Sequence, residues 1–147
     1  MALKNPVPVR ALGEIAIRCS DLPTMRAFYR DVVGLEVLRD FSEGSGIVFF
    51  RISEGFGGHT AVLALFSADA EDRRALHPTG AKPETGARSS LHHLALTVAR
   101  DQQGALEAYF TEIGLAYRVE VFDWIGWRGT FVTDPEGNTV EFVAGPA

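Results

Sequence analysis

The sequence Phe28-Tyr29-Arg30-Asp31-Val32-Val33-Gly34-Leu35 occurs a second time, in altered form, as Tyr109-Phe110-Thr111-Glu112-Ile113-Gly114-Leu115. The first copy belongs to a segment of about residues 12–66, and the second belongs to a segment of about residues 91–143. A repeated unit of this size is too small to enclose a core by itself. The sequence therefore predicts two similar units that together form one domain, with a site between them.

Both segments show the same order of patterns. Residues 12–19 alternate apolar and polar side chains, which predicts a strand. Ser20 or Asp21 can cap the helix that follows, which ends at Gly34. Three further strands are expected at 35–39, 47–52 and 60–66. The second segment predicts a strand, a helix and three strands at 91–98, 102–113, 117–122, 129–133 and 139–143. The prediction is an α+β fold of two tandem βαβββ units.

The segment between the two units, about residues 67–90, contains few large apolar side chains and several helix-breaking residues. It is expected to be a linker, and a linker of this length is either mobile or functional, for example as a lid. The whole chain, residues 1–147, is then one domain.

The composition excludes several classes of partner. The chain has 147 residues, of which 46% are hydrophobic and 22% are charged, as in ordinary globular domains. Its formal net charge of -5 gives no electrostatic reason to expect binding to nucleic acid or to an anionic membrane. The first residues contain no long apolar run, so neither a signal peptide nor an anchor is expected. We expect a cytoplasmic protein whose single cysteine, Cys19, is a buried thiol.

The alternation of the strands places three titratable residues on one concave surface. In the first strand of each unit, Glu14 and His93 lie on the face opposite the helix. In the last strand, Val140 and Phe142 should face the helix, which leaves Glu141 on the open side. Buried charges need water, mutual hydrogen bonds or a cation.

A divalent metal ion would satisfy this requirement. One imidazole and two carboxylates suit Fe, Mn, Ni or Zn and leave coordination positions open for substrate oxygens. The other interpretations are a hydrogen-bonded core histidine for His93, an exposed edge carboxylate for Glu141, and an ion pair of Glu14 with Arg18 or Arg128.

Several other residues are candidates for substrate binding. Trp124, Trp127 and Arg128 lie in a glycine-rich connection that enters the strand before the last. Large aromatic rings can pack on a substrate, and arginine can bind a carboxylate or an enolate oxygen. The tryptophans can equally fill the core or a dimer contact. Phe49 and Arg51 share one strand face and are expected to line the same cup.

These motifs carry a resemblance to a known family. The repeated Phe28-Tyr29 to Gly34-Leu35 pattern, the strand that begins at His93 and the ending at 134–141 resemble the vicinal oxygen chelate superfamily. This family includes glyoxalases, extradiol dioxygenases, epimerases and bleomycin or fosfomycin resistance proteins. The resemblance covers nearly all of residues 12–143 and implies paired curved sheets around a cup-shaped site.

The resemblance also implies a set of metal ligands. His93 and Glu141 match the ligand positions of the second unit, and Glu14 lies where many members have a histidine. Glyoxalase-type members have a further ligand on the fourth strand of the first unit, where this chain has Ala61 or Val62. His59 is a candidate replacement for that ligand.

The function implied is that of a metal-dependent enzyme that acts on a small substrate with vicinal oxygens. The reaction is that of a lyase, an isomerase or a ring-cleaving dioxygenase, with Glu14 or Glu141 as base and Arg18 or Arg128 orienting a substrate anion. The alternative is a metal-free protein that binds a small molecule or antibiotic, as bleomycin-resistance proteins do. The resemblance also implies a homodimer.

Overall fold

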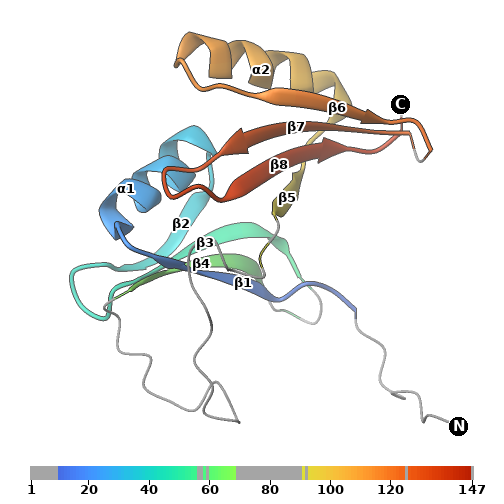
Figure 1. The fold of residues 1–147 in the computed structure, drawn as a ribbon. Coiled ribbons are helices and arrows are strands. Elements are labelled where there is room, and N and C mark those ends of the chain that lie inside the picture. The colour runs from blue at the N-terminus through green and yellow to red at the C-terminus, as the bar shows by residue number, and fades with distance from the viewer. Residues whose placement is uncertain are drawn as a thin grey trace, which may run out of the picture. The chain divides into compact units, whose positions relative to one another are not determined.

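The computed structural model describes residues 10–55, 58, 60–68, 91, 93–124 and 126–146. The chain divides into two compact units, Met1–Glu71 and Asp72–Ala147. This division agrees with the repeat found in the sequence. Each unit has a four-stranded sheet, and Figure 1 shows helical turns beside the sheet of each unit considered by itself.

The first unit contains its elements in the predicted order. They are β1 (Glu14–Cys19), α1 (Leu22–Ala27), η1 (Phe28–Val32), β2 (Glu36–Phe41), β3 (Ile47–Glu54) and β4 (Thr60–Ser67). The sheet order is β1-β4-β3-β2, in which β1 is parallel to β4 and the other neighbours are antiparallel. Asp21 caps α1, because its carboxylate accepts a hydrogen bond from Thr24 N at 3.1 Å.

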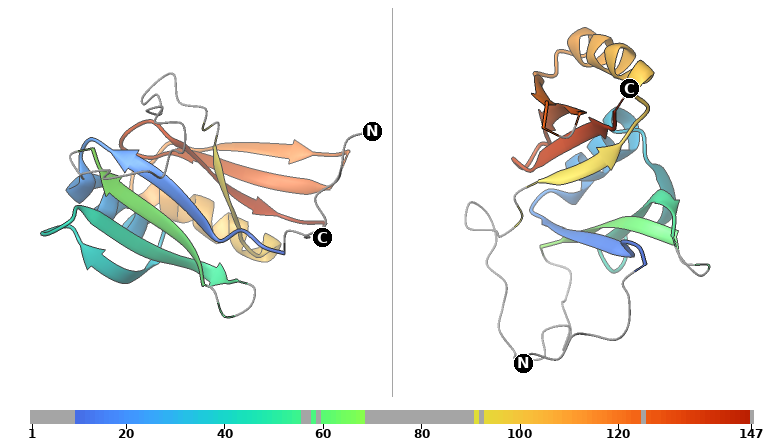
Figure 2. Two further views of the ribbon diagram at one scale, coloured as in Figure 1. Left: turned by 90° about the horizontal axis from the view of Figure 1, so that it is seen from below. Right: turned by 90° about the vertical axis from the view of Figure 1, so that its right-hand side faces the viewer.

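The second unit repeats this topology. Its elements are β5 (Leu94–Thr97), η3 (Arg100–Gln102), α2 (Gln103–Glu112), β6 (Arg118–Phe122), β7 (Trp127–Thr133) and β8 (Thr139–Ala144). The sheet order β5-β8-β7-β6 is the counterpart of the order in the first unit. The prediction of an α+β fold with two tandem βαβββ units is confirmed. Figure 2 shows the same layering from two further directions.

The first copy of the repeated motif is one residue longer than the second, and the helix geometry explains the difference. The turn η1 is a π-helix in which Val33 N donates to Phe28 O, five residues earlier. The matching bond in α2 runs from Ile113 N to Tyr109 O, four residues earlier. A π turn accommodates one inserted residue in a helix. In both units the leucine after the glycine bonds back to the last helical turn, Leu35 N to Tyr29 O and Leu115 N to Phe110 O.

The core of each unit lies between its helix and its sheet. Met25 and Tyr29 of the first unit are fully buried, and the Tyr29 ring lies 6.3 Å from that of the equally buried Phe50. In the second unit, the Phe110 ring lies 5.5 Å from that of Phe142. Burial of such a side chain stabilises the fold by about 1.5–3 kcal/mol. The opposite face of each sheet carries polar side chains, Glu14 and Arg18 in the first unit and Glu141 in the second.

Among the helices of the described residues, none combines the length and the apolar character that crossing a membrane would require. Cys19 is a buried thiol with no exposed surface, as predicted, and its Sγ donates to Ile17 O at 3.7 Å.

Candidate functional site

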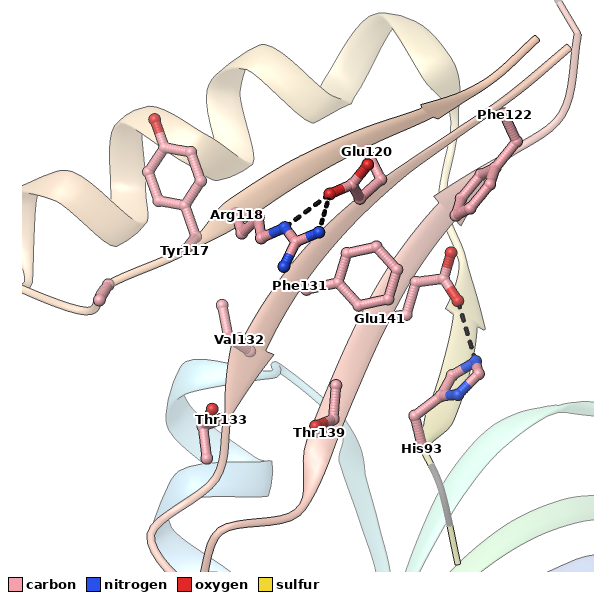
Figure 3. A pocket seen from close by; sticks show the side chains of 11 residues that line it. His93, Tyr117, Arg118, Glu120, Phe122, Phe131, Val132, Thr133, Thr139 and Glu141 are labelled. Carbon is pink, nitrogen blue, oxygen red and sulfur yellow. Dashed lines mark hydrogen bonds and ion pairs between the residues drawn. The ribbon is translucent and has the colours of Figure 1, made fainter.

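A histidine and a glutamate form a close pair on the open face of the second sheet. His93 Nε2 lies 3.2 Å from Glu141 Oε2, and a dashed line marks this pair in Figure 3. The Glu141 side chain is 8% exposed, and that of His93 is 36% exposed. Phe142 packs against Phe110 of α2 whereas Glu141 lines a cavity on the other face, as the alternation of β8 predicts. A carboxylate this deeply buried needs a polar or cationic partner, and His93 supplies one.

Gly129 makes room for the Glu141 carboxylate. It is the neighbour of Val143 in the β7–β8 ladder and lies on the same face as Glu141. A Cβ atom at Gly129 would lie 2.5 Å from Glu141 Oε1 and 2.9 Å from Cε2 of Phe131. Any larger residue would therefore displace the carboxylate or the ring. The glycine fixes the direction in which Glu141 extends.

A cavity of about 780 Å³ lies over this face and contains the pair. Its other lining residues include Tyr117, Arg118, Glu120, Phe122 and Phe131. Figure 3 shows the Phe131 ring between an Arg118–Glu120 ion pair and the Glu141 side chain. A cavity with apolar walls and a few polar groups is the usual form of a small-molecule site.

The sequence analysis did not select these five residues. The necessary signal is the alternation of β6 and β7, which places 118, 120 and 122 on one face with 131. The pairing of β6 with β7 cannot be read from either strand alone.

The open face of the first sheet carries the other predicted polar residues. Glu14 and Arg51 both pair with Val62, from its two sides, and all three lie on one face. Arg18 is exposed on the same face, and Phe49, paired with Ala64, is half-buried there. Arg51 Nη2 lies 3.9 Å from Glu54 Oε1.

The register corrects the position that matches Glu141 in the first unit. Glu141 pairs with Ala95, and the repeat aligns Ala95 with Ala16. Ala16 pairs with Ala64, so Ala64 is the counterpart, whereas the sequence had suggested Ala61 or Val62. The error arose because the offset between the repeats changes from strand to strand. The conclusion that an apolar residue replaces the carboxylate is unchanged.

Arg128 does not lie where the sequence analysis placed it. Its Nη1 atom lies 2.6 Å from Oε1 of Glu107 on α2, so its side chain faces the helix and not the cavity. The alternation of β7 explains this, since Arg128 and Gly129 point to opposite faces. The suggested ion pair of Arg128 with Glu14 is replaced by this pair.

Glu107 is the centre of a polar layer beneath α2. Thr130 Oγ1 donates to Glu107 Oε1 at 2.9 Å. The Arg128 guanidinium, with this hydroxyl, holds the pKa of Glu107 below its usual value, although burial acts in the opposite direction. Gln103, 1% exposed, donates from Nε2 to Arg128 O and Phe142 O. These bonds fix the helix to β7 and β8.

The two tryptophans are largely outside the cavity. Trp124 is 82% exposed in the turn between β6 and β7, and Trp127 is 42% exposed at the start of β7. Neither is among the described residues that line the cavity. His59 and residues 69–90 of the expected linker lie outside the described residues.

No group of three or more histidine, cysteine, aspartate or glutamate side chains is close enough to hold a metal within the residues described. The second unit by itself contributes two such side chains, His93 and Glu141, with their donor atoms 3.2 Å apart. An imidazole nitrogen and a carboxylate oxygen are ligands that first-row divalent metals accept. These two residues therefore fit part of a metal site.

Comparisons with known proteins agree with the fold. A structure described as lactoylglutathione lyase from Agrobacterium tumefaciens is 24% identical, with a TM-score of 0.70, and the match covers 97% of this chain and 96% of that one. A glyoxalase/dioxygenase from Nostoc punctiforme is 20% identical, with a TM-score of 0.71, over 100% and 99% of the two chains. A fosfomycin resistance protein from Listeria monocytogenes is 16% identical, with a TM-score of 0.62, over 94% and 95%.

A search of curated proteins gave no significant match. The family model described as Glyoxalase/Bleomycin resistance protein/Dioxygenase superfamily matches residues 11–142, which is nearly the whole chain and includes both units. The resemblance inferred from the repeated motifs is thereby confirmed. The chain belongs to the Glyoxalase/Bleomycin resistance protein/Dioxygenase superfamily.

Proposed function

We propose that the protein is a divalent-metal-dependent enzyme that acts on a small substrate with two adjacent oxygen atoms. The observation that carries the proposal is the pair of donor atoms, His93 Nε2 and Glu141 Oε2, 3.2 Å apart in a cavity of about 780 Å³. Such a cavity has the size of a small-molecule site. A lyase, an isomerase and a ring-cleaving dioxygenase are the reaction classes that we consider.

The residues proposed to hold the metal are Glu14, His93 and Glu141. Two carboxylates and one imidazole suit Fe, Mn, Ni or Zn, as the donor set of the sequence predicts. When bound, such an ion supplies Lewis-acid polarisation of the substrate oxygens. Within the second unit the donor atoms of His93 and Glu141 lie 3.2 Å apart, and in the first unit Glu14 lies on the exposed face of β1.

The chain's own carboxylates are proposed to move the proton. Glu14 or Glu141 would act as general base toward a carbon-bound or hydroxyl proton of the substrate. Glu14 is the more accessible of the two, since it is exposed on its sheet, whereas Glu141 is buried beside His93. Arg18, on the same face as Glu14, is proposed to orient a substrate anion. We also propose a homodimer.

A second candidate function is metal-free binding of a small aromatic molecule. The observation that favours it is the set of aromatic side chains in the cavity, Tyr117, Phe122 and Phe131, together with the absence of a ligating group at Ala64. Aromatic rings bind flat ligands without any metal. In this case His93 and Glu141 would be a hydrogen-bonded pair only.

Metal analysis separates the two functions. Protein purified without chelators and titrated with Mn²⁺, Ni²⁺ or Zn²⁺ should bind one ion per chain, and His93→Ala, Glu141→Ala and Glu14→Ala should each lose it. Glu43→Ala, which removes an exposed carboxylate in a turn, is the matched control and should bind metal normally. Absence of binding by the unmodified protein, or unchanged binding by the three variants, would exclude the enzyme function and leave the binding protein.

A further inference from the structure

A row of side chains crosses the open face of the second sheet. Arg118 on β6 pairs with Phe131 on β7, Phe131 pairs with Glu141 on β8, and Glu141 pairs with Ala95 on β5. Neighbouring strands lie about 4.8 Å apart, so the backbones of Arg118 and Glu141 are separated by about 10 Å. Phe131 occupies the interval between a cationic end and an acidic end of the row, as seen in Figure 3.

The cationic end is accessible and weakly held. The Arg118 side chain is 78% exposed, and its Nε donates to Glu120 Oε1 at 2.6 Å. Exposed ion pairs contribute little to stability and are screened by solvent. A guanidinium presents parallel N–H donors that match a carboxylate. An incoming carboxylate can therefore replace Glu120 as the partner of Arg118 at small cost.

The middle of the row is apolar and flat. The Phe131 ring lies 6.3 Å from the His93 ring in an edge-on arrangement, and Phe122 and Tyr117 also line the cavity. Aromatic side chains favour flat unsaturated ligands, through stacked or edge-to-face contacts. A single ring fits the interval of about 10 Å between the two ends of the row.

We propose that this cavity binds a small aromatic or similarly flat unsaturated carboxylic acid. Its carboxylate binds Arg118, its ring packs on Phe131, and its oxygen substituents reach His93 and Glu141. Only the last contact rests on the proposed function. Glu120 acts as an internal competitor that occupies Arg118 until the acid enters.

The test compares two probes that differ in one carboxylate, namely 3,4-dihydroxybenzoate and catechol. Calorimetric titration of chelator-treated protein should give a dissociation constant at least about tenfold lower for the acid, a factor that corresponds to about 1.4 kcal/mol. The ratio of the two constants should fall to about one in Arg118→Gln and should rise in Glu120→Gln, which frees the guanidinium.

Arg39→Gln is the matched control. Arg39 pairs with Phe49 in the first unit as Arg118 pairs with Phe131 in the second, but it does not line the cavity. It should leave the ratio unchanged. A ratio near one in the unmodified protein, binding of neither probe, or a ratio that survives Arg118→Gln would overturn the inference.

The titration separates this inference from the proposed metal dependence. Chelator-treated protein and the His93→Ala variant should both keep the preference for the acid, since Arg118 and Phe131 need no metal. A preference that persists in a protein that binds no metal would leave the inference standing without the enzyme function. Metal binding without a preference for the acid would overturn the inference and leave the proposed metal dependence standing.

Discussion

In both units one ion pair joins the helix to its sheet, but the pair lies on different strands. In the first unit Arg26 of α1 pairs with Asp40 on the edge strand β2, whereas in the second unit Glu107 of α2 pairs with Arg128 on β7. Ile17, Leu65 and Val48 form a paired row in the first sheet. The matching row of the second sheet is Leu96, Phe142 and Thr130, and Thr130 bonds Glu107.

The open faces differ at a single position of another matched row. The first sheet has Ala16, Ala64, Phe49 and Arg39 in order, and the second has Ala95, Glu141, Phe131 and Arg118. Only Ala64 and Glu141 differ in type. The duplication thus preserves the fold and the aromatic and cationic positions, while one substitution gives the second unit its acid. The difference teaches that, along this row, one residue type distinguishes the two open faces.

The buried apolar side chains beneath α1 should be the most sensitive to truncation. Phe50→Ala removes a fully buried ring and should lower the free energy of unfolding by about 3–5 kcal/mol, because the cavity left behind cannot be refilled. Urea denaturation measures the loss. Phe49→Ala, on the half-buried opposite face, is the control and should cost clearly less. Equal losses would show that the helix-facing core does not dominate.

The second-largest loss of stability should come from a change in the polar layer of the second unit. Glu107→Ala leaves Arg128, whose side chain is 25% exposed, without its partner. We expect a loss of about 2–3 kcal/mol, below the 3–5 kcal/mol typical of fully buried pairs. Replacing Glu107 and Arg128 together by leucine and methionine should recover most of it. Failure of the double variant to recover would contradict the pairwise account.

The same layer predicts a pH dependence. The pKa of Glu107 in the folded protein lies below the ordinary value of 4.5, so the unfolded chain binds more protons in the interval between the two. The stability that this group contributes is therefore complete above pH 4.5 and is lost as the pH falls through the folded-state pKa. Urea midpoints of Glu107→Gln should lack this component and lie closer to those of the unmodified protein at low pH than at neutral pH.

The open face of the second unit should respond to a single methyl group. Gly129→Ala places a Cβ atom 2.5 Å from Glu141 Oε1, so the carboxylate must turn away from its present position. Metal affinity should fall about 10–100-fold, as for other changes that orient ligands. Gly104→Ala in α2, where a Cβ meets nothing within 4 Å, should leave affinity unchanged. Equal metal affinities of the two variants would show that Gly129 does not orient Glu141 for metal binding.

The smallest effect should come from the helix caps, which also differ between the units. Asp21 caps α1 through Thr24, whereas Gln102 makes no side-chain cap bond for α2. Asp21→Ala should lower the urea midpoint slightly, and Gln102→Ala should not lower it. A larger effect at Gln102 would indicate that its side chain supports α2 in another way.

The sequence was sufficient for the elements and their order because each strand alternates clearly and each helix has a definite stop. Gly34 and Gly114 end the two helices and have φ values of 82° and 71°, which favour glycine. The faces of Glu14 and Glu141 followed from the same alternation. The cavity residues Arg118 and Phe131 did not, because they are brought together by strand pairing, which depends on turn lengths and register.

Arg128 shows the other limit of sequence reasoning. An arginine beside a glycine-rich connection suggested a substrate ligand, but its partner Glu107 is 21 residues away on α2, by the difference of their numbers. The sequence did not identify Ala64 for a related reason, since the register of β4 against β1 cannot be predicted from the sequence of either strand alone. Local pattern predicted which residues share a face, and tertiary pairing determined their neighbours.

The central proposal is that His93 and Glu141, on the open face of the second sheet, hold a divalent metal. Anomalous diffraction from crystals grown with Ni²⁺ or Zn²⁺ tests it most directly. The account predicts one peak per chain, with the His93 nitrogen and the Glu141 carboxylate each at about 2.0–2.2 Å from the metal. A peak elsewhere, or no peak at saturating metal, would contradict it.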